Sequence, residues 1–395
     1  MIYIKSGKRI YQNSIGENNL NSIQINNTPI DDGYYMPPEW SEHYGTIITF
    51  PTRIGTWGKK VEYAQAKFAE IALHIAKYEK VFIVVGKNNY NKAYNLMKDN
   101  VKYLFHDTDD SWVRDNGPTF VTNGINIRGI NWRFNAWGGE FDGLYTDWKL
   151  DDELAIKICN DLNIEYYDFG DFVLEGGSIH TNGKGTLVVT ESCLLSKGRN
   201  PKLSKQQIEN KLKSALGVKK VLWLPNGIFK DETNGHVDNM CAFVKENEVV
   251  LAWTDNESDP QYKLSKENYE YLNSEVDGNN NKIKIHKLPI PDIPICIDES
   301  DIELYQFDDT SNTINQTHNI GTRYPASYVN FYIANNIVLV PQFGGKNELS
   351  DKRAIEIISK LFADREIIGI DARVILMGGG NIHCITQQIP KFQIK

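Results

Sequence analysis

Apolar and polar positions follow one order that returns several times along the chain after residue 40. A strand that opens with polar residues leads through a turn into a short apolar strand, then an amphipathic helix, then another apolar strand. Apolar runs bounded by turn residues predict the strands, and apolar residues at i, i+3 and i+4 predict the helices. One copy contains TLVVT at 186–190, helical spacing at Ile208, Leu212 and Leu216, and VLWLP at 221–225.

Four regular copies and one less regular copy of this unit are predicted. Asn-Gly and similar dipeptides supply the hairpin turns. The opening strands are expected at 110–121, 175–180, 236–244 and 327–333, the helices at 152–160, 205–216, 261–272 and 352–362, and the closing strands at 164–167, 221–225, 283–290 and 366–370. The less regular copy spans about 46–105. Five units of about 70 residues are typical of a ring of repeated units rather than a solenoid.

The start of the chain differs from the rest. Residues 1–35 are rich in Asn and show no sustained apolar period, so we expect a peripheral extension with a short strand at 1–4, followed by one domain over 36–395. The first apolar run is broken at Lys5, and no window approaches the roughly 18 apolar residues that a membrane helix needs. We therefore expect a cytoplasmic protein with no membrane partner.

Composition narrows the range of partners. Apolar residues make up 41% of the chain and charged residues 24%, which is typical of a globular protein rather than a disordered or fibrous one. The 43 basic and 51 acidic residues give a net charge of −8, which disfavours a nucleic-acid partner. A negative field attracts cations, so a small cationic substrate is compatible with this charge.

The five cysteines are too few and too widely spaced for a disulfide framework, and no CxxC pair indicates a metal site. A small buried hydrophobe is the default interpretation of each one. Cys384 differs because three glycines at 378–380 precede it, and glycines permit close approach of the backbone to another group. The alternative for Cys384 is a buried thiol in a C-terminal strand.

Polar residues recur where the predicted units begin, at Asp115, Glu175, His236 and Asp238. In a ring, the starts of equivalent strands meet at the centre, so these side chains would converge with Cys384 on one pocket. His236 and Asp238 are two apart in a predicted strand and would point to the same face. Taken singly, each residue has a simpler interpretation. His236 and Asp238 fit a solvated hairpin, Asp115 fits an ion pair or a turn, and Glu175 fits an exposed strand start.

Taken together, these residues supply a nucleophile, a base and anionic anchors. Two carboxylates that face one pocket without a metal motif indicate a cationic ligand, and a planar guanidinium can bridge such carboxylates bidentately. His383 is adjacent to Cys384, so in a strand it would face away from the thiol. We therefore expect His383 to be structural rather than the catalytic base.

With these residues in place, the sequence resembles the agmatine deiminase family of the guanidine-modifying superfamily, from about residue 36 to 388. The segments that carry the resemblance are WVRDNGPTF, NWRFNAWGG, FVLEGGSIH, ESCLLSKGRNP, DETNGHVDN, LAWTDNESDPQY, ASYVNFYIANN and GGGNIHCITQQ. The resemblance implies the pentein fold, an α/β-propeller of five pseudo-symmetric ββαβ units around a central active site. It also implies hydrolysis of agmatine to N-carbamoylputrescine and ammonia, a reaction of putrescine synthesis.

The resemblance assigns a role to each candidate. It implies that Cys384 is the nucleophile and His236 the catalytic histidine. It implies that Asp115 and Asp238 bind the guanidinium and that Glu175 is the acidic partner of the histidine. Trp112 matches the aromatic residue that precedes the Arg-Asp pair and would contact the substrate. The family works without a metal or an organic cofactor and commonly assembles into homo-oligomers such as dimers or tetramers.

Two segments depart from the family pattern. These enzymes tend to carry Trp-Pro-Glu-Arg after the first core strand, whereas this chain has Phe-Pro-Thr-Arg at 50–53 and so lacks an acidic residue for the substrate's distal amine there. The polar stretch 298–323 is expected to be a loop, and its acidic residues are expected to face solvent: Asp301, Glu303, Asp308 and Asp309.

Other functions remain open at this point. Deimination of arginine or of peptidyl-arginine would need a positive anchor for a carboxylate, for which Arg53 or Arg323 could serve. An amidinotransferase would use the same thiol and pass the group to an amine. A non-catalytic binding scaffold is the alternative from another class, because fold does not fix function. Such a scaffold has no need for all five candidate residues.

Overall fold

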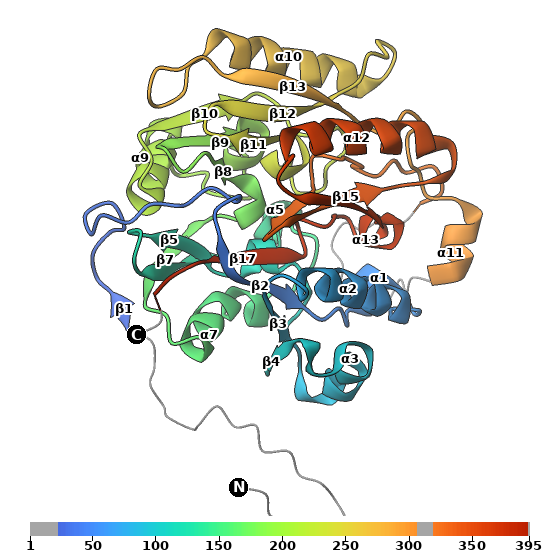
Figure 1. Cartoon of the computed structure of the whole chain (residues 1–395), viewed down its shortest axis with the longest axis horizontal. Coiled ribbons are helices and arrows are strands. Elements are labelled where there is room, and N and C mark those ends of the chain that lie inside the picture. Colours follow the sequence, from blue (N-terminus) through green and yellow to red (C-terminus); the bar gives the residue numbers. More distant parts are fainter. Residues whose placement is uncertain (1–22, 306–318, 394–395) are drawn as a thin grey trace, which may run out of the picture.

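Five small β-sheets surround the centre of the molecule in the computed structural model, which describes residues 23–305 and 319–393 (Figure 1). Four sheets repeat one pairing, in which the first strand is antiparallel to the second and the second is parallel to the third. These sheets are β5 (Thr119–Thr122), β6 (Ile127–Arg133) and β7 (Tyr166–Val173); β8 (His180–Thr181), β9 (Thr186–Thr190) and β10 (Lys220–Leu224); β11 (Cys241–Lys245), β12 (Glu248–Trp253) and β13 (Lys284–Pro289); and β14 (Tyr332–Ala334), β15 (Ile337–Gln342) and β16 (Glu366–Asp371).

A helix connects the two parallel strands of each unit, as such a crossover requires. These helices are α7 (Leu154–Asp161), α9 (Lys205–Leu216), α10 (Pro260–Ser274) and α12 (Glu348–Leu361), and α2 (Glu62–Ile75) has the same place in the fifth unit. The predicted α/β class and the ββαβ order of the units are confirmed. The predicted helix at 205–216 coincides with α9, while α12 begins four residues before the predicted 352.

Helix α9 shows why its bounds could be read from the sequence. Ser204 and Gln207 form a reciprocal capping box at its start, and Gly217 ends it in the left-handed conformation with φ 62°. Ile208, Leu212 and Leu216 are buried on one face, against the strands that the helix connects.

The fifth sheet joins the two ends of the described chain. β17 (Thr386–Pro390) is antiparallel to β2 (His43–Thr49), which is parallel to β3 (Lys80–Val84), and β4 (Lys102–Leu104) follows. The C-terminal strand therefore supplies the opening strand of the N-terminal unit and closes the ring. The copy at 46–105 looked irregular in the sequence because its opening strand is β17, near the other end of the described chain. In this pairing Thr386 lies opposite Ile48.

The opening strands begin later than predicted. Residues 113–116 form the one-turn helix α4 (Val113–Asn116), and the 3₁₀ turns η3 (Gly176–Ser178) and η4 (Val237–Asn239) precede β8 and β11. The expected strands over 110–121, 175–180, 236–244 and 327–333 are therefore wrong over most of their length, since β5, β8, β11 and β14 begin at 119, 180, 241 and 332. A local hydrogen bond closes each turn, for example from Met240 N to Val237 O at 2.8 Å, and replaces the bonds of a ladder.

Peripheral segments also differ from expectation. β1 (Gln24–Ile25) adds to the edge of β7, and Tyr35 bridges Thr122. The predicted strand at 1–4 lies outside the described residues. The segment expected to be a loop contains the helix α11 (Glu299–Tyr305), and Asp308 and Asp309 lie outside the described residues. Over 23–305 and 319–393, the search for a helix long and apolar enough to cross a bilayer finds none.

Candidate active site

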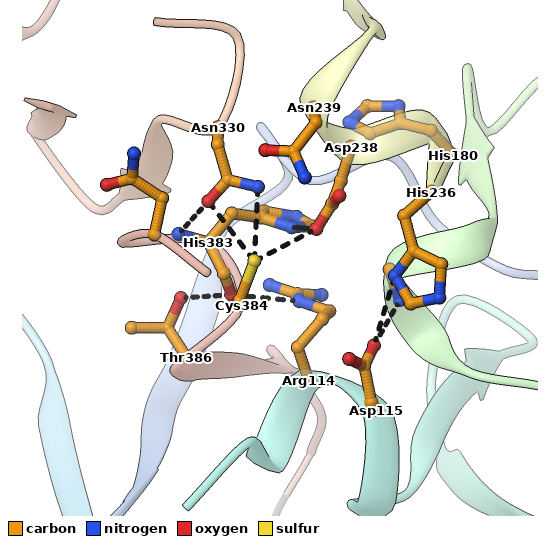
Figure 2. Close-up of polar contacts among 12 residues, drawn as sticks. Arg114, Asp115, His180, His236, Asp238, Asn239, Asn330, His383, Cys384 and Thr386 are labelled. Carbon is orange, nitrogen blue, oxygen red and sulfur yellow. Dashed lines mark hydrogen bonds and ion pairs between the residues drawn. The ribbon is translucent and has the colours of Figure 1, made fainter. Parts of the chain in front are cut away.

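Five short segments bring polar side chains to the centre of the ring, and each segment directly precedes the opening strand of one unit. Asp115 lies in α4 before β5, Glu175 precedes η3 and β8, and His236 and Asp238 lie at η4 before β11. Asn330 precedes β14, and Cys384 precedes β17. Figure 2 shows Asn330 and Asp238 pointing toward Cys384, with Asp115 and His236 facing each other to one side. The predicted convergence occurs, although the side chains project from turns rather than from strands.

A narrow pocket opens above the thiol and leaves about 400 Å³ unfilled by protein, its mouth included. It is lined by Asp110, Trp112, Asp115, Trp137, Leu144, Thr233, His236, Asn239, Gly378, Gly379, Gly380 and Cys384. Among the described residues of this lining, none is a lysine or an arginine. The pocket therefore presents apolar rings and carboxylates, which suits a cation with an apolar body.

The glycine run forms one wall of the pocket because a side chain would not fit there. A Cβ atom at Gly378 would lie 2.6 Å from the ring of Trp57, and one at Gly380 would lie 2.4 Å from the ring of Trp112. The two indole rings stack with their centroids 5.2 Å apart. The wall brings the backbone against Trp112 and leaves the space above Cys384 open.

Cys384 is buried and has polar neighbours on one side. Its Sγ lies 3.2 Å from Asn330 Nδ2 and 3.6 Å from Asp238 Oδ2 (Figure 2). Burial, followed by the negative charges of Asp238 and Asp115, raises the pKa of the Cys384 thiol well above its usual range. Without a cation in the pocket, the sulfur is therefore a neutral thiol at physiological pH.

Asp115 lies on the other side of the pocket and is held in place by two donors. Trp137 Nε1 donates to its Oδ2 at 2.9 Å, and Gly177 N donates to its Oδ1 at 2.8 Å. Burial is the main cause that raises the pKa of Asp115 to about 6, opposed by His236 and supported by the charges of Asp238 and Glu175. A bound cation between Asp115 and Asp238 would remove the repulsion between them.

His236 lies between two carboxylates, 3.8 Å from Asp115 Oδ1 through Nδ1 and 3.8 Å from Glu175 Oε2 through Nε2. Burial alone would lower the pKa of His236, but Asp115, the Cys193 thiol and Glu175 outweigh it and hold that pKa well above 6.5. The imidazole is therefore a cation at neutral pH and can donate a proton.

Arg199 completes this side of the site and was missed in the sequence. Its Nε lies 2.7 Å from Glu175 Oε1, and both side chains are fully buried. Burial alone would raise the pKa of Glu175, but Arg199 and His236 outweigh it and lower that pKa. Arg199 also donates to Thr233 O at 2.9 Å and to Asn234 Oδ1 at 2.6 Å, which ties the segment before His236 to the same group.

His383 corrects an expectation about geometry. Residues 382–385 form a turn before β17 rather than part of the strand. His383 therefore does not face away from the site: its Nδ1 lies 2.9 Å from Asp238 Oδ2, the oxygen that also faces the Cys384 thiol. That its role is not that of the base stays a prediction.

Trp112 lies in the pocket as expected, and a carboxylate that was not predicted holds it. Its Nε1 donates to Asp110 Oδ2 at 3.1 Å, and Thr56 Oγ1 donates to the same oxygen at 2.6 Å. Asp110 follows Asp109 in the sequence, and this acidic pair before Trp112 was the available signal.

The remaining cysteines are not pocket residues, but one of them is close to the site. Cys159, Cys193 and Cys241 are buried and Cys296 is half-buried. Within the described ranges, ligand atoms of Glu175, Cys193 and His236 lie within 4.8 Å of one another, which is a donor set for a metal ion. Arg199 is already paired with the carboxylate of this set.

The two arginines considered as anchors for a substrate carboxylate contact other residues, although the charge of Arg53 reaches Asp110 of the pocket lining and lowers its pKa against the effect of burial. The Arg53 guanidinium lies 4.5 Å from the ring centre of Tyr145. Arg323 Nη1 lies 2.9 Å from Asp259 Oδ1. Neither belongs to the pocket lining.

Known proteins share this chain's sequence and fold. Residues 35–390 match the model of the Porphyromonas-type peptidyl-arginine deiminase family. A Selenomonas ruminantium protein named "Putative agmatine deiminase" is 48% identical over 371 residues, which covers 93% of this chain and 98% of that protein. The solved agmatine deiminase of Enterococcus faecalis has 39% identity and a TM-score of 0.89, covering 93% and 99% of the two chains. A C. jejuni agmatine deiminase, solved as a cysteine-to-serine variant with substrate bound, has 29% identity and a TM-score of 0.74, covering 91% and 97%.

Proposed function

The chain belongs to the Porphyromonas-type peptidyl-arginine deiminase family, and from this premise we propose that it is an agmatine deiminase of the pentein fold. It hydrolyses agmatine to N-carbamoylputrescine and ammonia. One observation carries the proposal: a buried thiol, Cys384, lies 3.6 Å from the Asp238 carboxylate and lines a pocket whose described lining contains Asp115 and has no basic side chain except His236. Similarity to agmatine deiminases over more than nine-tenths of the chain supports it.

The guanidinium of the substrate binds between Asp115 and Asp238. A planar guanidinium offers parallel N–H donors, and each carboxylate accepts from one edge. Asp238 Oδ2 lies 3.6 Å from the Cys384 sulfur, so a guanidinium bound to it places its central carbon next to Sγ. The cation also stabilises the thiolate that the two carboxylates otherwise disfavour, and the thiol proton leaves to solvent as the substrate binds.

The reaction has two stages. The Cys384 thiolate attacks the central carbon and forms a C–S bond; His236 donates its proton to the departing nitrogen as the C–N bond breaks, and ammonia leaves. The carbon remains on sulfur as a thiouronium. Neutral His236 then takes a proton from a water whose oxygen attacks that carbon. The C–S bond breaks, the thiolate is regenerated, and the ureido product leaves after losing its remaining extra proton to solvent. Glu175, held by Arg199, keeps the imidazole cationic and oriented.

These side chains supply the nucleophile, the acid and base and the anionic anchors, so the proposed mechanism uses no metal or organic cofactor. The catalytic groups are Cys384, His236, Glu175, Asp238 and Asp115, and Trp112 lines the substrate's path. We further propose that residues 36–395 act as one catalytic domain, that the enzyme works in the cytoplasm, and that it assembles as a homo-oligomer. The similarity to the agmatine deiminase family supports these three points.

Ammonia release from agmatine and from arginine, measured side by side, tests the proposed function. We expect kcat/KM for agmatine to exceed that for arginine by about 100-fold or more, because the arginine carboxylate would enter an acidic pocket without a cationic partner. Equal turnover of both, or a preference for arginine, contradicts agmatine as the substrate. Consumption of agmatine without ammonia when a second amine is present identifies an amidinotransferase instead.

Glu232 is the side chain that we assign to the distal amine of agmatine. A Cβ atom at Gly379 would lie 3.4 Å from Glu232 Oε2, and one at Gly380 would lie 3.1 Å from Cys384 Cβ. The glycine wall thus runs from the thiol to this carboxylate. Glu232 is exposed by its surface area, while the neighbouring protein atoms and Asp231 still raise the pKa of its carboxyl group to about 7.

Replacing Glu232 by Gln should raise KM for agmatine by about 10- to 100-fold with a smaller change in kcat, since one charge-assisted contact to the ammonium is lost. Ionised Glu232 binds the amine, so the wild-type KM should fall as pH rises through about 7, and this fall should be absent in Glu232→Gln. Steady-state kinetics from pH 6 to 8 measure both effects. Glu246→Gln, an exposed carboxylate in another turn, is the matched control. An unchanged KM in Glu232→Gln would show that a residue other than Glu232 binds the amine.

A further inference from the structure

A buried cluster of charged side chains lies beneath Cys384 and takes no part in the steps above. It consists of Glu39, Arg114, His180 and His383, in contact with Asp238. At most 3% of the area of any of these side chains is exposed. Figure 2 shows His383 beside Asp238 and the sulfur, Arg114 next to Cys384, and His180 on the other side of Asp238.

His383 links two carboxylates of this cluster through its two ring nitrogens. Nδ1 lies 2.9 Å from Asp238 Oδ2, and Nε2 lies 2.8 Å from Glu39 Oε1. A neutral imidazole can donate from one nitrogen only, so two carboxylate partners at these distances favour the doubly protonated form. Burial and Arg114 would lower the pKa of His383, but Glu39 and Asp238 outweigh them and raise it.

Glu39 is the point where the other members of the cluster meet. His180 Nε2 lies 3.4 Å from Glu39 Oε2, and Arg114 Nη1 lies 3.6 Å from Glu39 Oε1. Arg114 also faces the turn of the nucleophile, where its Nε donates to His383 O and its backbone N donates to Cys384 O, both at 3.3 Å. Two carboxylates, Glu39 and Asp238, are thereby balanced by two cations, Arg114 and protonated His383.

We propose that Glu39 and His383 are positioning residues that hold Asp238 ionised and aimed at the Cys384 sulfur, ready to receive the guanidinium. This inference rests on the proposed function. Asp238 is the guanidinium carboxylate closest to the nucleophile, and its Oδ2 is shared between His383 and the Cys384 thiol. Glu39 acts through His383, since it keeps the proton that the imidazole shares with Asp238.

The charged groups around Asp238 determine in which direction its pKa should change when Glu39 is removed. His383 faces Asp238 from the C-terminal turn, His236 from its own segment and Arg114 from α4, and all three lower the pKa of Asp238 against the effect of burial. Removal of the Glu39 charge by itself would stabilise ionised Asp238 further. If Glu39 acts through His383, however, its removal lets His383 lose its proton, and Asp238 becomes harder to ionise.

The test compares Glu39→Gln, His383→Asn and the double variant in the full-length enzyme. His383→Asn retains a donor near the position of Nδ1 but loses the charge and the link to Glu39. Asp115, with a pKa of about 6, already protonates on the acidic limb of kcat/KM for agmatine, whereas the pKa of Asp238 is lowered. We expect each single variant to raise the pKa of Asp238, so that a second protonation steepens this limb and lowers kcat/KM about tenfold at its acid end. The loss should appear in KM more than in kcat, and the double variant should show no further loss.

Glu79→Gln is the matched control. Glu79 is also a fully buried carboxylate beside a histidine, with His43 Nδ1 at 3.3 Å, and it accepts from Asn335 N at 2.8 Å. His43 Nε2 lies 2.8 Å from the backbone O of Glu39, so this control borders the cluster but leaves the Glu39 carboxylate and its contact with His383 in place. Loss of the Glu79 charge should lower thermal stability without changing the pH profile. A gain in kcat/KM at the acid end in Glu39→Gln, no change, or an equal loss in Glu79→Gln overturns the proposal.

Alkylation of Cys384 provides a second measurement that does not depend on agmatine turnover. Chloroacetamidine is cationic and needs an ionised Asp238, whereas iodoacetamide is neutral, so the ratio of their rates reports on the carboxylate. We expect this ratio to fall in Glu39→Gln and His383→Asn as the pH is lowered below 6, by about tenfold where Asp238 is protonated in the variants but still ionised in the wild type. If wild-type enzyme turns over no agmatine, the proposed function fails while this ratio still decides the role of Glu39. An unchanged ratio contradicts the positioning role.

Discussion

Replacing Cys384 by Ala should lower kcat for agmatine by about 10⁶-fold, the largest effect of any single substitution in this protein. In the proposed mechanism the sulfur forms and breaks the covalent bond to the substrate carbon, and Thr233 is the one other described lining residue with a hydroxyl or thiol group. Substrate binding should survive, because Asp115 of the pocket lining and the neighbouring Asp238 remain.

Ammonia release measures the loss, and calorimetric binding of agmatine to Cys384→Ala measures what survives. Cys296→Ala is the control, because this thiol is half-buried and outside the pocket. Intact-protein mass spectrometry of acid-quenched wild-type enzyme should detect the thiouronium on Cys384 as a covalent adduct. Turnover within about tenfold of wild type in Cys384→Ala would exclude covalent catalysis by this residue.

Replacing His236 by Gln should reduce kcat by about 10²- to 10⁴-fold, since the departing nitrogen and the attacking water both lose their proton partner. The glutamine still fits between Asp115 and Glu175 but cannot carry a proton. The pKa of His236 is raised well above 6.5, so the wild-type acid step is present at neutral pH and is lost as pH rises through that raised pKa.

The measurement is the pH dependence of kcat together with a quenched-flow assay of the adduct. The alkaline decline due to His236 should disappear in His236→Gln, and any adduct that forms should hydrolyse slowly. His106→Gln is the control, because His106 pairs with Asp161 at the surface, 2.8 Å away, and should leave the profile unchanged. Normal turnover in His236→Gln would show that another group acts as the acid and the base.

Patterns that depend on local sequence could be predicted well. The capping box at Ser204 and the left-handed Gly217 bound α9, and the apolar spacing between them fixes the buried face. The convergence of the polar residues at the starts of the units was also predictable, because equivalent positions of repeated units meet at the centre of a ring. These residues are Asp115, Glu175, His236 and Asp238. The one-turn helix around Asp115 was not, since four helical residues leave no periodic signal.

Residues that act only through distant partners could not be found in the sequence. Glu39 contacts His383, which is 344 positions away in the sequence. Arg199 lies in the segment Gly-Arg-Asn-Pro, whose composition is typical of a surface turn and does not indicate a buried charge. Asn330 was within reach, because it occupies in the fourth unit the place that Cys384 has in the fifth. The segment 50–53 lacks an acidic residue to bind the distal amine of the substrate. The residue proposed for this contact, Glu232, lies in a different segment, so the sequence of 50–53 could not identify it.

The closure of the ring by β17 also couples the integrity of the fold to the thiol of the site. The strand that completes the N-terminal sheet begins two residues after Cys384, so one short segment both supplies the thiol and covers the edge of β2. Proteolytic cleavage before residue 384 would therefore open the ring and remove the thiol in a single event.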